Sequence, residues 1–202
     1  MRRNGLWIVA MMCTWSSYAQ AGERTRPADL SHADIAGVRI GMTKDEAVAA
    51  ATFVLKVPKS AVSFEQSPAV NPVTNTAEPN YFSLEKGLVK LTVHMAPQIP
   101  RDTKNPMRVE MISYAMPWTP DNVKAMKEAA IQKYGSPSNG LIPAVSDWCN
   151  VPDKNPGMAC EFDARNHRKL SLSGTELTLT DMSYHDALQD FMNMQNRVKP
   201  SF

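Results

Sequence analysis

Residues 43–58 read TKDEAVAAATFVLKVP, and this stretch predicts the first element of the fold. Thr43 and Glu46 have the spacing of a capping box, in which each side chain binds a backbone N–H at a helix start. Apolar residues then recur at helical spacing up to Leu55, and Pro58 marks the stop. We therefore expect an amphipathic helix that begins after Thr43.

Two further helices are predicted by similar signals. Thr119 is a good N-cap, Pro120 suits the first helical position, and Gly135 suits the end of a helix. A third helix is expected to begin near Asp181 or Ser183, where apolar residues repeat at helical spacing.

Between these helices the hydrophobic period falls to two, which indicates strands. The clearest case is residues 88–95, LVKLTVHM, where Lys90, Thr92 and His94 occupy the polar phase. The other expected strands are 61–65, 81–84, 107–116, 147–151, 159–163, 170–174 and 176–181. The polar stretch 66–79 is expected to be a mobile loop.

The order helix, strands, helix, strands, helix predicts an α+β protein with antiparallel sheets and helices on one face. We expect two tandem helix-plus-sheet units, 35–117 and 118–202, which share or abut one core; the second carries a disulfide hairpin and the C-terminal helix. Residues 22–34 are expected to be a polar leader outside the core.

Residues 1–21 have the pattern of a cleaved secretory signal: basic Arg2 and Arg3, an apolar run over 6–13, and the small-x-small sequence Ala19-Gln20-Ala21. A membrane anchor is the alternative, but the run is about half the length that a spanning helix needs. The chain has 22 basic and 20 acidic residues, and cleavage would make the two numbers equal. A neutral chain has no electrostatic footprint for nucleic acid or an anionic membrane surface. We expect a periplasmic protein with no membrane span.

Cleavage would leave Cys149 and Cys160 as the remaining cysteines. An even number in an exported protein predicts a disulfide, here clasping a hairpin whose loop is rich in turn-forming residues. A reactive cysteine is the alternative, but no C-x-x-C sequence supports it.

The sequence favours no catalytic, cofactor or metal site. Ser83 and Lys86 match the S-x-x-K of penicillin-recognising enzymes, but the partner motifs of that family are missing. The many methionines could suggest copper(I) binding, although most occupy the apolar phase of an element, as core residues do.

Four scattered residues keep a chemical alternative open. Asp181 and His185 stand four apart and could share a metal on one helix face, although Asp181 is better explained as a helix cap. An enzyme site assembled from Asp163, His167 and Asp181 is the third class of function considered.

Partner binding has better support than catalysis. Tyr114, Met116 and Trp118 cluster where the first unit meets the second, and such side chains are common at binding hot spots. The alternative, which such residues fill more often, is that they simply hold the two units together. Asp153 and Lys154 lie on the clasped loop, which suits insertion into a partner's cleft or is a plain surface hairpin.

Residues 34–47, DIAGVRIGMTKDEA, resemble the helix start of small bacterial envelope proteins. They are similar to the small lipoprotein of the β-barrel assembly machine, whose helix-on-sheet architecture the beta-lactamase inhibitor proteins have in tandem. Residues 133–137, KYGSP, resemble the helix ends of such units. The resemblance implies a sheet with helices on one face, whose exposed sheet face or loops bind another protein. The chain departs from the lipoprotein because it lacks a lipidation cysteine and is roughly double the length.

These patterns together predict a non-enzymatic periplasmic protein that binds another protein. An inhibitor or immunity protein against an envelope-acting toxin or enzyme is the leading hypothesis. An accessory factor in outer-membrane or envelope assembly is the alternative. The sequence leaves the oligomeric state and the identity of the partner open.

Overall fold

The computed structural model describes residues 27–139, 145–152, 160–161 and 166–195. The expected signal segment 1–21, Asp153, Lys154 and Asp163 therefore lie outside the described residues. The helices of the described part are α1 (Lys44–Leu55), α2 (Pro120–Tyr134) and α3 (Ser183–Gln195), with a short 3₁₀ turn η1 (Lys59–Ala61).

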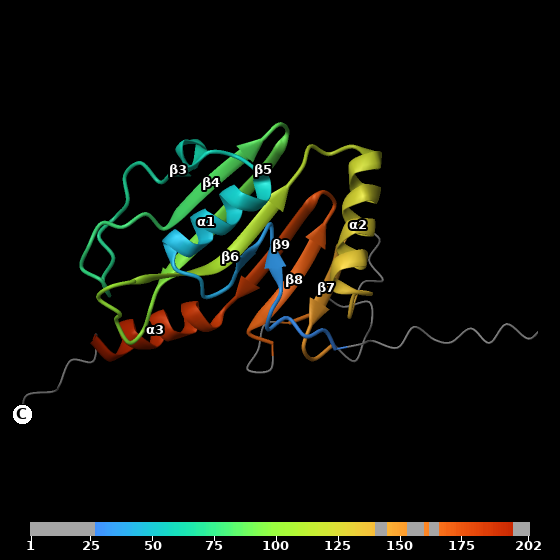
Figure 1. Ribbon diagram of the computed structural model, residues 1–202. Helices are drawn as coiled ribbons and strands as arrows, with labels where there is room; N and C mark the ends of the chain where they lie inside the picture. The colour runs from blue at the N-terminus through green and yellow to red at the C-terminus, as the bar shows by residue number, and fades with distance from the viewer. Residues whose placement is uncertain (1–26, 140–144, 153–159, 162–165, 196–202) are drawn as a thin grey trace, which may run out of the picture.

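Seven strands form one antiparallel sheet in the order β3-β4-β5-β6-β9-β8-β7 (Figure 1). Strands β6 and β9 are neighbours, so strands from both expected units share this sheet. Two further strands, β1 (Asp34–Ile35) and β2 (Val38–Arg39), form a small ribbon. The seven are β3 (Ser63–Phe64), β4 (Tyr81–Lys86), β5 (Val89–Pro97), β6 (Met107–Ala115), β7 (Val145–Cys149), β8 (Arg168–Ser173) and β9 (Glu176–Asp181).

The helix starts follow the expected capping chemistry. The Thr43 N–H donates to Glu46 Oε2 at 2.9 Å, and the Glu46 N–H donates to Thr43 Oγ1 at 3.3 Å, which completes the capping box of α1. At α2, Thr119 Oγ1 accepts from the N–H of Asn122 at 3.1 Å, and Gly135 ends the helix with φ +81°.

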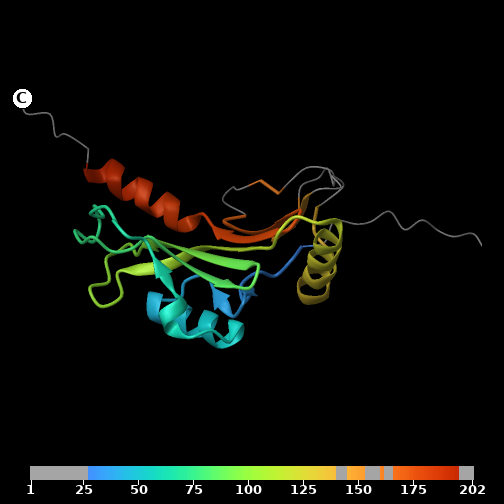
Figure 2. The ribbon, with the colours of Figure 1, turned by 90° about the horizontal axis from the view of Figure 1, so that it is seen from above.

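One face of the sheet carries the core. A single cross-strand row on this face is apolar on all seven strands, and α1 and α2 cover it (Figure 2). The row consists of Phe64, Phe82, Val93, Ile112, Leu179, Leu170 and Trp148. Trp148 is fully buried, and its Nε1 donates to the Gly135 carbonyl at 2.9 Å.

The expectation that the helices share one face is wrong for α3, which lies on the side of the sheet opposite α1 (Figure 2). Strand β9 ends at Asp181 and α3 begins at Ser183, so a very short link decides which face the helix takes. The apolar residues of α3 are partly exposed, and none of its described residues is buried.

The expected pairing of strand 147–151 with strand 159–163 is also wrong for the described residues. Strand β7 pairs with β8 instead, which aligns Trp148 with Leu170 in the core row. Cys160 and Glu161, the described part of the expected partner strand, are not in a strand. The gain in apolar contact explains why β7 joins the large sheet rather than a local hairpin.

Two other segments are better anchored than expected. Within the expected polar leader, Leu30 is buried in the core and the Ala28 N–H donates to the Cys149 carbonyl at 2.8 Å. Within the expected mobile loop 66–79, Val73 is buried and Glu78 forms an ion pair with Lys44 of α1 at 3.1 Å.

Candidate functional site

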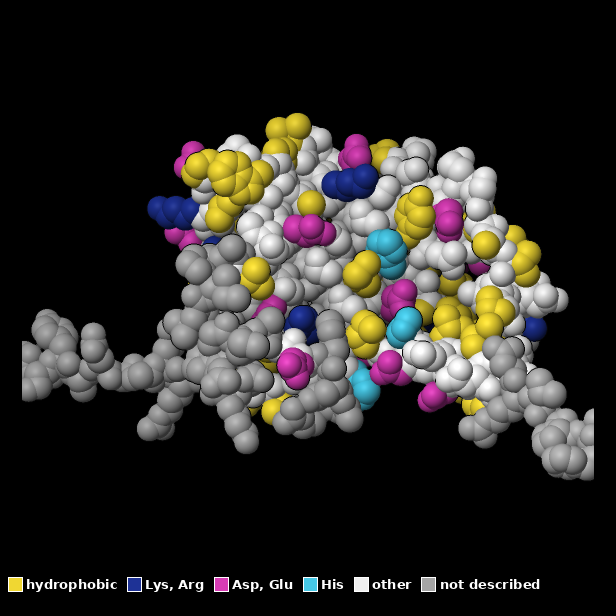
Figure 3. Space-filling view, turned by 180° about the vertical axis from the view of Figure 1, so that it is seen from behind, with side chains coloured by type: hydrophobic (Ala, Val, Ile, Leu, Met, Phe, Trp, Pro, Cys, Tyr) yellow, Lys and Arg dark blue, Asp and Glu magenta, His cyan; other side chains and the backbone are white. Residues whose placement is uncertain are grey.

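The sheet face opposite α1 and α2 presents a continuous row of small polar side chains, which we call the hydroxyl row. It lies beside the apolar core row but on the other face, because side chains alternate along each strand. Figure 3 shows this face, where the backbone and uncharged polar side chains, drawn white, lie among apolar, charged and histidine side chains. The row consists of Ser63, Ser83, Thr92, Ser113, Thr178, Ser171 and Asp147.

Several hydroxyl groups in the middle of the hydroxyl row form no hydrogen bond with the described part of the protein. Ser113 Oγ donates to Glu176 Oε1 at 2.6 Å, so that hydroxyl is engaged. The hydroxyls of Ser83, Thr92 and Thr178 have no protein hydrogen-bond partner among the described residues, and all three residues are partly exposed. A hydroxyl can donate and accept, so this part of the row can bind polar groups of another molecule.

One end of the hydroxyl row is locked by the disulfide. The buried carboxylate of Asp147 accepts from Ser171 Oγ at 2.6 Å and from the Cys160 N–H at 3.0 Å. Cys149 and Cys160 are joined by an S–S bond of 2.06 Å, as expected from the sequence. These contacts fix the segment at Cys160 against the edge of the sheet.

Larger side chains border the hydroxyl row on either side. The Tyr81 and His94 rings lie next to each other on neighbouring strands, with centroids 5.7 Å apart. Burial lowers the pKa of His94, which favours the neutral ring at pH 7. On the other side, Lys90 Nζ lies 3.8 Å from Glu85 Oε1. The row is therefore flanked by side chains that can contact a partner from the sides.

Ionisable groups gather where α3 meets the open face. Glu110 lies at the bulge between β5 and β6; burial raises the pKa of its carboxyl, and the nearby His185 of α3 opposes this shift. His167 Nδ1 lies 3.5 Å from Asp186 Oδ2. Among the described residues no group of three or more His, Cys, Asp or Glu side chains is placed to hold a metal ion.

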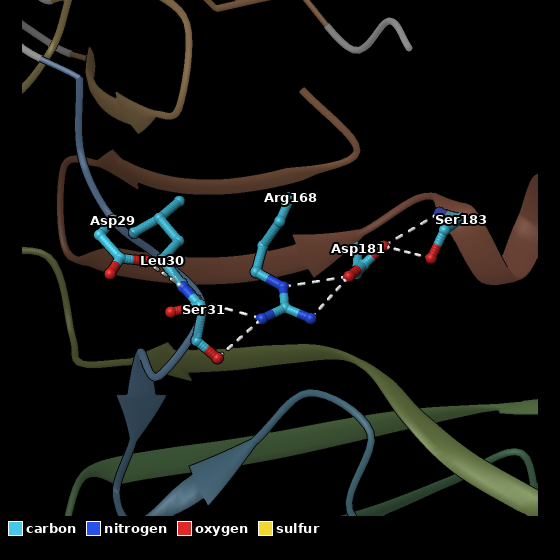
Figure 4. Close-up of polar contacts among 6 residues, drawn as sticks. All are labelled: Asp29, Leu30, Ser31, Arg168, Asp181 and Ser183. Carbon is cyan, nitrogen blue, oxygen red and sulfur yellow. Dashed lines mark hydrogen bonds and ion pairs between the residues drawn. The ribbon is translucent and has the colours of Figure 1, made fainter. Parts of the chain in front are cut away.

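Asp181 is an anchor for three segments (Figure 4). Its Oδ2 accepts from Arg168 Nε at 3.0 Å and Nη2 at 2.8 Å, and its Oδ1 accepts from the Ser183 N–H and Oγ at 3.0 and 2.6 Å. Arg168 Nη1 also donates to the carbonyls of Leu30 and Ser31. Burial alone would raise the pKa of Asp181, but the hydrogen bonds from Ser183 and Arg168 outweigh it and lower the pKa. Both carboxylate oxygens of Asp181, which the sequence offered as an alternative metal ligand, thus already accept hydrogen bonds from the protein.

The structure describes three of the five predicted partner-binding residues and separates Trp118 from the other two. Tyr114 lies on the core face between Leu91 and Leu177 and is partly buried, and Met116 packs against the same core. Trp118 is 72% exposed. The other two predicted residues, on the clasped loop, lie outside the part of the chain that the structure describes.

A shallow cavity of about 480 Å³ lies at the N-terminal end of α1. The Glu46 carboxylate on its wall already accepts both the N–H and the hydroxyl of Thr43, so it serves the helix cap. The cavity is lined by Ser31, His32, Arg39, Ile40, Gly41, Met42 and Glu46.

Sequence reasoning missed the hydroxyl row as a unit. The alternation in residues 88–95 already placed Thr92 on a polar face, but the alignment of seven such positions depends on six strand registers. Comparisons with known protein families, curated proteins and solved structures found no match. In the described part of the chain no helix is long and apolar enough to cross a membrane.

Proposed function

We propose that this is a non-enzymatic, exported protein that binds another protein through the open face of its sheet. The observation that carries the proposal is the hydroxyl row, which crosses all seven strands and is at least partly exposed on six of them, with Asp147 buried at one end. Of the described helices, α3 lies on this side of the sheet (Figure 2). The leading form of the proposal is an inhibitor or immunity protein that blocks an envelope-acting toxin or enzyme.

The geometry of the face suits protein recognition. Its backbone is held in a seven-stranded sheet, so docking a partner orders little additional chain and loses little entropy. Small side chains such as Thr92 and Thr178 allow a partner's loop to approach the sheet closely. Their hydroxyls supply the directional hydrogen bonds that polar interfaces use, and Tyr81 offers an aromatic contact beside them.

The disulfide supports the compartment. Disulfides persist in oxidising environments such as the bacterial periplasm, and the bond between Cys149 and Cys160 agrees with export through a cleaved signal at residues 1–21. The proposed periplasmic location therefore rests on the disulfide and on the sequence pattern of the first residues together.

Site-specific photo-crosslinking in the living cell tests the proposal. A photoreactive amino acid is placed at Thr92 or Thr178 on the open face and, as matched controls, at Ala49 of α1 or Gln132 of α2, which are exposed on the other side of the sheet. We expect one adduct of constant mass from the two open-face positions and none from the two controls.

The identity of the crosslinked protein then separates the two functional hypotheses. A toxin or enzyme whose activity falls when the complex forms supports the inhibitor or immunity role. A subunit of an outer-membrane assembly complex supports the accessory role. Adducts of equal yield from all four positions, or from the controls alone, would contradict binding through the open face.

A further inference from the structure

The three most exposed large apolar side chains of the described chain belong to three different chain reversals. Phe53, near the end of α1, is 83% exposed; Leu88, in the β4–β5 turn, is 81% exposed; Trp118, between β6 and α2, is 72% exposed. All three reversals lie along the upper edge of the molecule in Figure 1, and Figure 2 looks down on that edge. Single exposed apolar residues are common, but three tips at one end form a patch that requires an explanation.

Strand register supports the closeness of two of these tips. Lys90 of β5 pairs with Ala115 of β6. Leu88 precedes Lys90 by two residues and Trp118 follows Ala115 by three, so both leave the sheet at the same end of neighbouring strands. The Leu88 and Trp118 reversals therefore lie at the same end of the sheet, where neighbouring strands are about 4.8 Å apart.

Trp118 is held in place rather than free to fold back. The residue before it, Pro117, has its carbonyl bound by Asn122 Nδ2 at 2.8 Å, and Pro120 follows two residues later. The indole lies over Gly174, where an added Cβ would meet Trp118 Cδ1 at 3.7 Å. A side chain that is exposed and already ordered loses little conformational entropy when it binds to another surface.

Lysines surround the patch. Lys56 follows α1, Lys86 precedes the β4–β5 turn and Lys127 lies on α2; all three are exposed, and none forms an ion pair within the described residues. Two acids stand against them at this end. Asp121 lies in the first turn of α2, and the exposed Glu176 lies in the same cross-strand row as Glu85 and Lys90.

Two glutamates near the patch are already compensated. Glu85 Oε1 lies 3.8 Å from Lys90 Nζ, and Glu128 Oε1 lies 4.0 Å from Lys124 Nζ. With these pairs counted as neutral, three lysines stand against Asp121 and Glu176, whose printed partner is the neutral Ser113 hydroxyl, so the apolar end of the molecule keeps a small excess of positive charge.

We propose that this end of the molecule docks onto the surface of a bilayer that contains anionic phospholipid. Trp118 is of a type that settles at the lipid headgroup level, and Phe53 and Leu88 add apolar area. The lysines meet the anionic headgroups while their alkyl stems cover apolar surface. The chain as a whole has 22 basic and 20 acidic residues, so its long-range attraction to an anionic surface is weak. Salt screens charges beyond about 10 Å, so the charges close to the surface matter most at contact.

This docking is independent of the proposed protein binding. The patch lies at the end of the sheet, whereas the hydroxyl row lies on its open face, so a docked molecule keeps that face accessible (Figures 1 and 3). A partner anchored in the same membrane would then be met in a fixed orientation.

Vesicle sedimentation with the signal-free chain tests the proposal. We expect binding to vesicles of phosphatidylcholine with phosphatidylglycerol, weaker binding to pure phosphatidylcholine, and loss of binding as salt rises. Trp118→Ser and Leu88→Ser should each lower the partition coefficient at least about tenfold, because each removes inserted apolar area. The matched control is Val70→Ser, which removes a 63% exposed apolar side chain from loop 66–79 at another place on the molecule and should leave binding unchanged.

Several outcomes would overturn the proposal. The first is that the parent does not bind the anionic vesicles. The second is that the parent and all three serine variants bind them equally. The third is that the parent forms a concentration-dependent dimer, which Trp118→Ser abolishes, while no protein sediments with the vesicles. Circular dichroism confirms that each variant is folded. Thr92→Arg on the open face should bind vesicles like the parent, so failure of protein binding and failure of lipid binding are distinguishable.

Discussion

Removal of Arg168 tests how the N-terminal segment, β8, β9 and α3 are held together. In Arg168→Leu, Asp181 Oδ2 loses donors at 3.0 and 2.8 Å, and the carbonyls of Leu30 and Ser31 lose donors at 3.2 and 3.0 Å. Asp181, whose side chain is 9% exposed, keeps the two bonds from Ser183 but loses the countercharge of Arg168.

The expected cost follows from this geometry. Removing one partner of a buried ion pair costs about 3–5 kcal/mol, because the remaining charge is left without compensation. The Arg168 side chain is partly exposed and Ser183 still serves Asp181, so we expect the low end, about 3 kcal/mol at pH 7. Adding Asp181→Asn should recover about 1 kcal/mol or more, since it removes the stranded charge and keeps an acceptor for Ser183.

The cost should also depend on pH. In the parent, the folded-state pKa of Asp181 lies below its unfolded value, so its contribution is present above about pH 4 and is lost as the pH falls through the folded-state pKa. In Arg168→Leu, burial remains while the cation is gone, so the pKa of Asp181 should rise. The difference in stability between parent and variant should therefore shrink as the pH falls below 4.

Urea unfolding followed by far-UV circular dichroism measures both effects at pH 7 and at acid pH. A loss below about 1 kcal/mol at pH 7 would place Arg168 among ordinary surface ion pairs and refute the anchoring argument. A loss that is large but the same at all pH values would refute the role of the Asp181 charge.

Three further changes have defined outcomes in the same unfolding assay. Trp148→Ala should cost about 3–5 kcal/mol, because it opens a cavity in the core row and frees the Gly135 carbonyl; a cost under 1 kcal/mol would contradict full burial. Thr43→Ala should cost about 1 kcal/mol by removing the cap of α1, and Thr43→Ser should restore most of it. Reduction of the bond between Cys149 and Cys160 should cost about 2–3 kcal/mol, and mass mapping without reductant should find the two joined.

Local signals explain which parts of the fold could be predicted. The capping residues Thr43 and Thr119 act within one turn of their own helices, so both helix starts were predictable from adjacent residues. The alternation in residues 88–95 likewise predicts, residue by residue, which side chains of this strand are buried. Each of these signals depends on neighbours in the chain and on no distant contact.

The features that could not be predicted depend on distant contacts. The amphipathic pattern of α3 says which side of the helix is apolar, but not which face of the sheet it meets. Strand β7 could form a local hairpin or join β8, and the alignment of Trp148 with Leu170 decides for β8. The hydroxyl row exists because the registers of six strand pairs bring Thr92, Thr178 and their neighbours into line.

The sequence identified Trp118 as a candidate partner-binding residue, but the structure gives a different reason for its accessibility. The sequence placed it with Tyr114 and Met116 as one cluster, because the three lie within five residues. The structure places Tyr114 and Met116 against the core and leaves Trp118 exposed at the end of the sheet. Sequence proximity identified the segment, but strand alternation and the turn after β6 decide which side chain a partner can reach.

Binding of the purified crosslinked partner to open-face variants tests the central claim most directly. Thr92→Arg and Thr178→Arg each place a long charged side chain in the middle of the hydroxyl row, and Ala49→Arg places the same side chain on the exposed side of α1. Isothermal titration calorimetry measures the affinity of each variant for the partner. Thr92→Arg and Thr178→Arg should each raise the dissociation constant about 100-fold or more, which corresponds to a loss of about 2.7 kcal/mol of binding free energy. Ala49→Arg should bind the partner with the affinity of the parent. Equal affinity for all three variants would contradict the claim that the open face of the sheet is the binding surface.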